Sequence, residues 1–209
     1  WYPKGMHYDA EQKILMLPRG VDIDKMKWAL GDETIIRVIR DADPFEKIDR
    51  PLNIKYTPRD EDQKQAIKFI MGLDPYQYTS QYAMLSLNLN TGKGKTYCTI
   101  ASMALKGQRC AIITDTNGCL EQWYTFFQEY TDIDPNDICW VGPNNVRKLA
   151  NSPKRYSVYL ALHSTLRAYA NRVGWQGVGD LIRSWMIGVK IYDEAHLDMD
   201  NMFKIDCYT

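Results

Sequence analysis

A glycine-rich turn contains the residues of this sequence that are best suited to bind phosphate. Residues 90–96 read Asn-Thr-Gly-Lys-Gly-Lys-Thr and lie between an apolar run at 83–89 and a helical pattern at 95–106. Glycines let backbone N–H groups turn toward an anion, and the N-terminus of the next helix adds positive potential. Lys95 can reach the outer phosphates of a nucleotide, and the Thr96 hydroxyl can bind a magnesium ion that keeps most of its waters. The nucleotide-binding candidates here are Thr91, Gly92, Lys93, Gly94, Lys95 and Thr96.

The turn departs from the usual phosphate-loop pattern, G-x-x-x-x-G-K-[ST], at its first position, where Leu89 stands. The Gly-Lys-Thr core remains, in the order of strand, turn and helix that the pattern requires. A plain glycine-rich turn without a ligand is the alternative interpretation.

Two adjacent carboxylates, Asp193 and Glu194, lie at the end of the predicted strand Val189–Tyr192. Ligands of open parallel sheets bind beyond the carboxyl ends of the strands, so we expect Asp193 and Thr96 to share a magnesium ion. Glu194 could orient or deprotonate an attacking water. A solvated loop is the alternative for the pair. The predicted catalytic residues are Lys95, Asp193 and Glu194.

Strands that alternate with helices must position these two motifs. Alternation of this kind implies right-handed crossovers and a parallel sheet flanked by helices, so the predicted fold class is α/β. Trp123 and Phe127 have the spacing of a buried helix face, which favours the core over base stacking. The predicted elements are helices at 95–106 and 120–130, helical turns around Leu166 and Leu181, and strands at 83–89, 109–114, 138–141, 156–162 and 187–192.

The first 51 residues predict a small accessory α+β domain. A strand at 12–17, a turn at 18–20, a short helix through Leu30 and a strand at 34–39 make up its pattern. The charged stretch at 41–58 contains three prolines, and we interpret it as a linker. The domain boundary is therefore predicted near residue 52, with the nucleotide-binding domain at 52–209.

Composition excludes several classes of protein. Among 209 residues, 26 are Lys or Arg and 26 are Asp or Glu, and a net charge of zero still allows a local basic cleft for nucleic acid. No apolar run reaches the ~20 residues that cross a membrane, and because residues 1–10 are polar and mixed we expect no signal peptide. The five cysteines lack CxxC or zinc-finger spacing, which indicates reduced thiols in the cytoplasm, or in a host cytoplasm if the source is viral.

With these residues in place, the chain resembles superfamily 2 helicases of the DEAH-box group, of phage and repair type, over roughly residues 55–209. The motif that names this group is Asp-Glu-Ala-His, which stands here at 193–196. RDEDQKQAI at 59–67 resembles the segment that reads adenine, which implies Gln63 and Arg59 as nucleotide-binding residues, since an amide can donate and accept at once. An exposed residue at a helix start is the alternative for Gln63. His196 is equally consistent with a structural role and with coupling ATP to motion.

Two further segments resemble the family's nucleic-acid contacts. DTNGCLEQW at 115–123 resembles the segment that touches the nucleic-acid backbone, with Cys119 where leucine is more common. LHSTL at 162–166 resembles a later segment in which Ser or Thr binds phosphate. LPRG at 17–20 resembles a small domain that holds duplex DNA, with a packing extension as the alternative. The nucleic-acid-binding residues implied are Asp115, Thr116, Asn117, Ser164 and Thr165.

The resemblance implies an ATP- and Mg2+-dependent helicase or translocase. Its partner is nucleic acid, with DNA favoured over RNA, and no membrane contact is expected. The family continues with a Ser/Thr-Ala-Thr segment and a second RecA-like domain, whose arginines contribute ~10³–10⁵ in rate. We expect that domain to be missing from this chain, which alone should be weakly active or inactive. Two alternatives remain: a DNA translocase subunit of a restriction or defence system, and a non-catalytic nucleic-acid-binding module.

Overall fold

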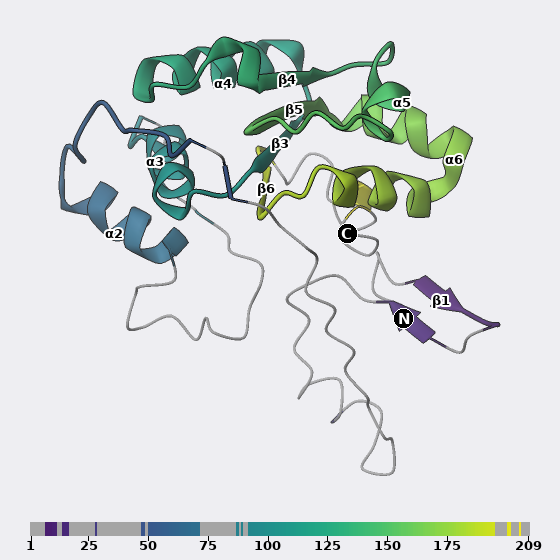
Figure 1. Cartoon of the computed structure of the whole chain (residues 1–209). Helices are drawn as coiled ribbons and strands as arrows, with labels where there is room; N and C mark the ends of the chain where they lie inside the picture. The colour runs from purple at the N-terminus through teal and green to yellow at the C-terminus, as the bar shows by residue number, and fades with distance from the viewer. Residues whose placement is uncertain are drawn as a thin grey trace.

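A four-stranded parallel sheet with helices on both faces forms the main body of the protein (Figure 1). The computed structural model describes residues 7–11, 14–16, 28, 47–48, 50–71, 87, 89, 92–194, 200–201 and 205. The strands lie in the order β4–β5–β3–β6, and all three neighbouring pairs run parallel. The predicted α/β class is therefore confirmed. The strand bounds are β3 Cys110–Thr114, β4 Ile138–Val141, β5 Val158–Leu162 and β6 Val189–Tyr192.

Helices cover the two faces of the sheet as separate layers. The helix bounds are α2 Glu61–Met71, α3 Lys95–Lys106, α4 Asn117–Tyr130, α5 Val146–Leu149 and α6 His163–Ser184, with a short 3-10 turn, η1, at Pro135–Asp137. Successive side chains of a strand point to opposite faces, so Cys110 and Ile112 pack with α3 and α4. Ala111 and Ile113 pack with α5 and α6 on the other face. The helix α2 lies against α3 in a third buried cluster.

Local sequence signals set the ends of the two helices nearest the candidate sites. The helix α3 follows Gly94 and ends at Gly107, both in the left-handed conformation that glycine adopts without a steric penalty. The predicted bounds of α3 are confirmed. The helix α4 starts three residues earlier than predicted, because the Thr116 side chain accepts a hydrogen bond from the Cys119 N–H and so caps an additional turn.

The stretch at 41–58 is not a free linker over its described part. Ile48 is buried, and its N–H donates to the carbonyl of Gly107 at 3.0 Å. Asp132 accepts hydrogen bonds from the Asn53 backbone at 2.8 Å and from the Arg50 side chain at 2.7 Å. These bonds attach the segment to residues that follow α3 and α4, a contact that the abundance of charges and prolines did not reveal. The domain boundary near residue 52 stays a prediction.

The described N-terminal residues include one hairpin. Strand β1 (His7–Asp9) pairs antiparallel with β2 (Ile14–Met16), which falls within the strand predicted at 12–17. Trp28 is helical, as predicted for its segment. The predicted strand at 34–39 lies outside the described residues, as does most of the strand at 83–89. No described helix is both long and apolar enough to span a membrane.

Candidate nucleotide and nucleic-acid sites

The glycine-rich turn places two left-handed glycines immediately before α3. Gly92 has φ 79° and Gly94 has φ 82°. The Lys95 ammonium group, in the first turn of α3, donates to the backbone carbonyl of Leu89 at 2.8 Å. The lysine is thus folded over its own turn, within reach of the phosphates that the turn would hold. Thr91 lies outside the described residues.

Gln63 ties the glycine-rich turn to the segment before α2. Its side chain is buried, with 5% of the residue exposed, so the alternative of an exposed helix-start residue is wrong. The side-chain oxygen accepts from the Arg59 N–H at 2.8 Å, and the side-chain NH2 donates to the Lys93 carbonyl at 3.2 Å. A Cβ atom at Gly94 would lie 2.5 Å from that nitrogen. The structure thus assigns Gln63 a contact that the sequence did not predict, namely support of the turn itself.

The start of α2 carries two further polar contacts. The Asp60 carboxylate accepts from the Gln63 N–H at 3.0 Å and caps the helix, and this hydrogen bond is the main reason that the pKa of Asp60 is lowered. Lys93 and Asp62 form an ion pair at 3.2 Å with both side chains exposed. Exposed pairs contribute little to stability, so the buried amide of Gln63 is the contact that fixes the turn.

The acidic pair lies at the carboxyl end of β6. Strand alternation places Asp193 on the same face as Val189 and Ile191, which pack with the cluster of α3 and α4. One carboxylate oxygen of Asp193 accepts from the Trp123 indole N–H at 2.8 Å, and the other accepts from the Glu194 N–H at 3.1 Å. Both oxygens are therefore held in a fixed orientation, on the sheet face that α3 covers.

Glu194 has a backbone conformation that is rare for a residue with a side chain. Its φ is 51°, and its side chain is exposed. A non-glycine residue in the left-handed region costs about 1–2 kcal/mol, and such residues concentrate at functional sites where the surrounding structure holds them. The strain supports a functional role for the turn after β6. His196 lies outside the described residues.

Trp123 shows what the sequence predicted correctly and what it missed. The residue is 5% exposed and Phe127 is fully buried, so the prediction that both belong to the core is confirmed. The hydrogen bond to Asp193 was not predicted. A buried tryptophan usually finds a partner for its N–H, which was the one available signal, but the sequence does not name that partner.

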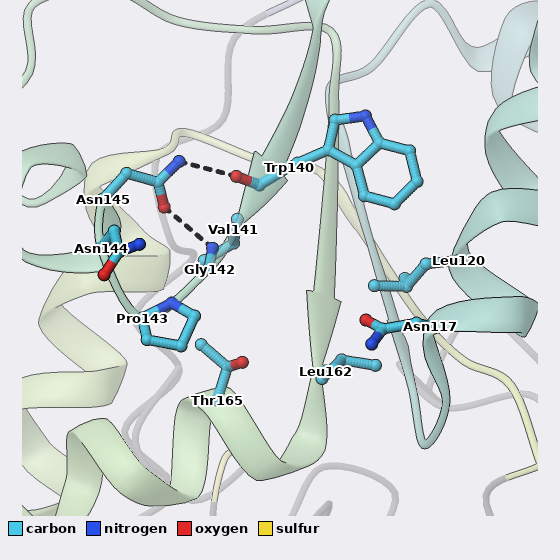
Figure 2. A pocket seen from close by; sticks show the side chains of 10 residues that line it. All are labelled: Asn117, Leu120, Trp140, Val141, Gly142, Pro143, Asn144, Asn145, Leu162 and Thr165. Atoms are coloured by element: carbon cyan, nitrogen blue, oxygen red, sulfur yellow. Dashed lines mark hydrogen bonds between the residues drawn. The ribbon is translucent and has the colours of Figure 1, made fainter.

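A pocket of about 240 Å³ joins the two segments predicted to bind nucleic acid (Figure 2). Asn117 comes from the start of α4, and Thr165 comes from the first turn of α6. Figure 2 shows Pro143 and Thr165 on one side of the pocket, and Leu120 and Asn117 on the other. The loop at 142–145 forms part of the lining, and the sequence analysis did not identify it.

The remaining predicted nucleic-acid residues do not line this pocket, although Thr116 and Ser164 adjoin lining residues in the chain. Asp115 is half-buried, Ser164 is exposed, and the Thr116 side chain is engaged in capping α4. The loop at 142–145 is held in shape by Asn145, whose amide donates to the Trp140 carbonyl at 2.7 Å and accepts from the Gly142 N–H at 2.8 Å. The pocket wall is therefore preformed.

None of the three buried cysteines in the described part of the chain is a reactive thiolate. Four cysteines are described, and none forms a disulfide. Burial raises the pKa of Cys98 and of Cys139 to about 11, and complete burial raises the pKa of Cys110 well above its ordinary value. These three thiols stay protonated near neutral pH and act as small core residues.

The parallel sheet, the glycine-rich turn before α3 and the acidic pair after β6 together define a RecA-like domain of the superfamily 2 helicase type. A family model described as "Type III restriction enzyme, res subunit" (ResIII) matches residues 55–204. The match covers well over half of the 209 residues, and the chain belongs to this family. Membership makes it a helicase-like ATP-binding domain and implies interaction with nucleic acid. No curated protein matches the chain.

Proposed function

We propose that this chain is the ATP-binding portion of an ATP-dependent nucleic-acid helicase or translocase that uses Mg2+. Lys95 and the turn at 91–96 would hold the phosphates of ATP, Thr96 and Asp193 would hold the metal, and Glu194 would orient or deprotonate water. Bound Mg2+ would neutralise charge that develops on the phosphates. Each of these groups is of a type that suits its role, because hydroxyl and carboxylate oxygens are the ligands that Mg2+ prefers.

One observation carries the proposal most directly: the phosphate-binding turn is built from buried contacts rather than left as a loose loop. Gln63 holds the turn through Lys93 and excludes a side chain at Gly94. A plain connection between a strand and a helix would not need a buried amide at this place. Because Gln63 also bonds to Arg59, an adenine that contacted this segment would lie next to the turn. We propose that both residues contribute to nucleotide binding.

The nucleic acid would run over the edge of the sheet where the strands end. Asn117 and Thr165 share one pocket there, and the exposed Ser164 lies next to Thr165 in the chain. Asp115 and Thr116 complete the proposed surface. DNA is the proposed substrate, and residues 1–51 are proposed as an accessory domain ahead of the motor domain.

Thermal stability with and without Mg–ATP tests the nucleotide site. A ligand that binds only the folded state stabilises it by about 2.7 kcal/mol at a hundredfold excess over Kd. We expect this gain in the wild-type chain and its loss in Lys95→Ala, because the ammonium group that pairs with phosphate is gone. Lys106→Ala is the matched control, since Lys106 lies at the opposite end of the same helix. Equal stabilisation of wild type and Lys95→Ala would refute the proposed site, and a wild type without stabilisation would favour the non-catalytic alternative.

A second candidate function is that of a translocase in a restriction or defence system, which moves along DNA without separating its strands. The description of the matched family, a restriction-enzyme subunit, favours this candidate. The two functions differ in product, so the full-length protein can be tested on two substrates. A helicase separates a forked duplex, whereas a pure translocase displaces a triplex-forming strand and leaves the duplex intact.

A further inference from the structure

The hydrogen bond between Trp123 and Asp193 connects the two candidate sites of this protein. The indole N–H lies 2.8 Å from the carboxylate oxygen, and the two residues are 70 positions apart in the sequence. Trp123 belongs to α4, and Asp193 follows β6. The bond is shielded from water on the tryptophan side, where only 5% of the residue is exposed. Bonds to a charged acceptor in such surroundings are among the stronger ones in proteins.

Trp123 does more than fill space in the core. Phenylalanine would keep an aromatic ring at this place in the core but could not donate to a carboxylate. The second oxygen of Asp193 is occupied by the Glu194 N–H. With one donor on each oxygen, the carboxylate plane cannot rotate freely, and the orientation in which it would meet a metal is set before any ligand binds.

The helix that carries Trp123 also reaches the nucleic-acid pocket. Asn117 and Leu120 of α4 line this pocket. Leu120 belongs to the same buried cluster as Trp123 and lies about one helical turn before it. Asn117 and Trp123 are six positions apart, which is about 9 Å along a helix that rises 1.5 Å per residue. Phe127, which is fully buried with its ring centroid 6.2 Å from that of Trp123, anchors the next turn.

We propose that Trp123 is a positioning residue that orients Asp193 for the metal and, through the rigid helix α4, links Asp193 to occupancy of the nucleic-acid pocket. The inference rests on the function proposed above. A strand bound at Asn117 and Leu120 contacts the helix that holds the indole, and any shift of that helix changes the hydrogen bond to Asp193. The metal-binding carboxylate is therefore the point at which strand binding is communicated to the nucleotide site.

Trp123→Phe tests the orienting role without measuring turnover. The readout is anisotropy of a fluorescent ATP analogue, titrated with Mg2+ at fixed nucleotide. Loss of a partner that orients a metal ligand weakens metal affinity by roughly 10- to 100-fold, so the half-saturating Mg2+ concentration should rise by that factor. Trp185→Phe is the matched control, because Trp185 is a buried tryptophan in the cluster of α5 and α6, and its indole N–H has no hydrogen-bond partner among the described residues. It should leave the Mg2+ dependence unchanged.

Two further arms test the mechanism. In an Asp193→Asn background, Trp123→Phe should cause no additional weakening, since the charged acceptor is already absent. A single-stranded oligonucleotide should shift the Mg2+ half-saturation of the wild type, and the shift should be lost in Trp123→Phe. If Trp123→Phe does not fold, the test uses the wild type instead, and the readout is the set of indole N–H signals in its NMR spectrum. One of the six tryptophan signals should move with Mg2+ and nucleotide, and the same signal should be displaced in Asp193→Asn.

The outcomes separate this inference from the proposed function. A wild type that binds the analogue through Lys95, with the same Mg2+ dependence in Trp123→Phe, overturns the inference and leaves the function standing. A wild type that binds no analogue at any Mg2+ concentration overturns the proposed function, and the inference with it. Indole signals that do not respond to Mg2+ and nucleotide would likewise overturn it.

Discussion

Replacing Gly94 with alanine tests whether the glycine-rich turn is built around Gln63. At Gly94 the φ of 82° makes any side chain strained, and a Cβ would lie 2.5 Å from the Gln63 side-chain nitrogen. At Gly92 the φ of 79° imposes a similar strain, but no atom lies within 4 Å of the added Cβ. The two glycines share the strained backbone and differ mainly in the close contact with Gln63, so Gly92→Ala is the matched control.

The expected magnitudes follow from these contacts. The left-handed conformation costs a residue with a Cβ about 1–2 kcal/mol, which is the full expected effect of Gly92→Ala on the free energy of unfolding. At Gly94 the buried amide must also move away from the Lys93 carbonyl, and a buried polar group left without its partner costs about 1–3 kcal/mol more. Gly94→Ala should therefore destabilise the chain by about 2–5 kcal/mol.

Urea unfolding of four proteins measures the coupling: wild type, Gln63→Ala, Gly94→Ala and the double variant. Without the Gln63 amide, the added Cβ meets only the Tyr97 Cβ at 3.9 Å, an ordinary van der Waals contact, so the cost of Gly94→Ala should fall close to that of Gly92→Ala. The coupling free energy should be about 1–3 kcal/mol. The reasoning is refuted if Gly94→Ala costs no more than Gly92→Ala, or if the two substitutions add to within about 0.5 kcal/mol.

Two other predictions concern catalysis and pH. Glu194→Gln in the full-length protein should bind Mg–ATP with unchanged affinity but hydrolyse it about 10²–10⁴-fold more slowly, because an amide cannot accept a proton. The rate of phosphate release measures this effect. Retained turnover would exclude Glu194 as the group that acts on water. Hydrogen bonds from Asn53, aided by the Arg50 charge, lower the pKa of Asp132. A carboxyl group whose pKa is lowered on folding stabilises the protein above its unfolded pKa of about 3.9, and this stabilisation is lost as the pH falls through the lower folded pKa. The urea midpoint of Asp132→Asn should therefore lie below that of the wild type at pH 6, and the two midpoints should converge below pH ~4. A difference in midpoint that stays constant across this pH range would exclude the carboxylate as the cause.

The sequence alone determined most of the sheet and its helices, because the signals involved are local. The helix at 95–106 has an apolar face and is followed directly by a glycine stop, Gly107, and the strand at 138–141 is a short apolar run. The burial of Trp123 and Phe127 followed from their spacing. The residue types in the glycine-rich turn and the acidic pair were also sufficient to propose a nucleotide site, since phosphate and Mg2+ require few kinds of group.

Only the tertiary structure decided how these groups are held. The amide of Gln63 meets the turn across 30 positions of sequence, and the indole of Trp123 meets Asp193 across 70. Pairings at such separations depend on how the helices pack on the sheet, and no local pattern encodes which donor will face which acceptor. For the same reason the loop at 142–145 went unrecognised: its residues resemble an ordinary turn, and they line a pocket only because parallel strands bring their carboxyl ends together at one edge.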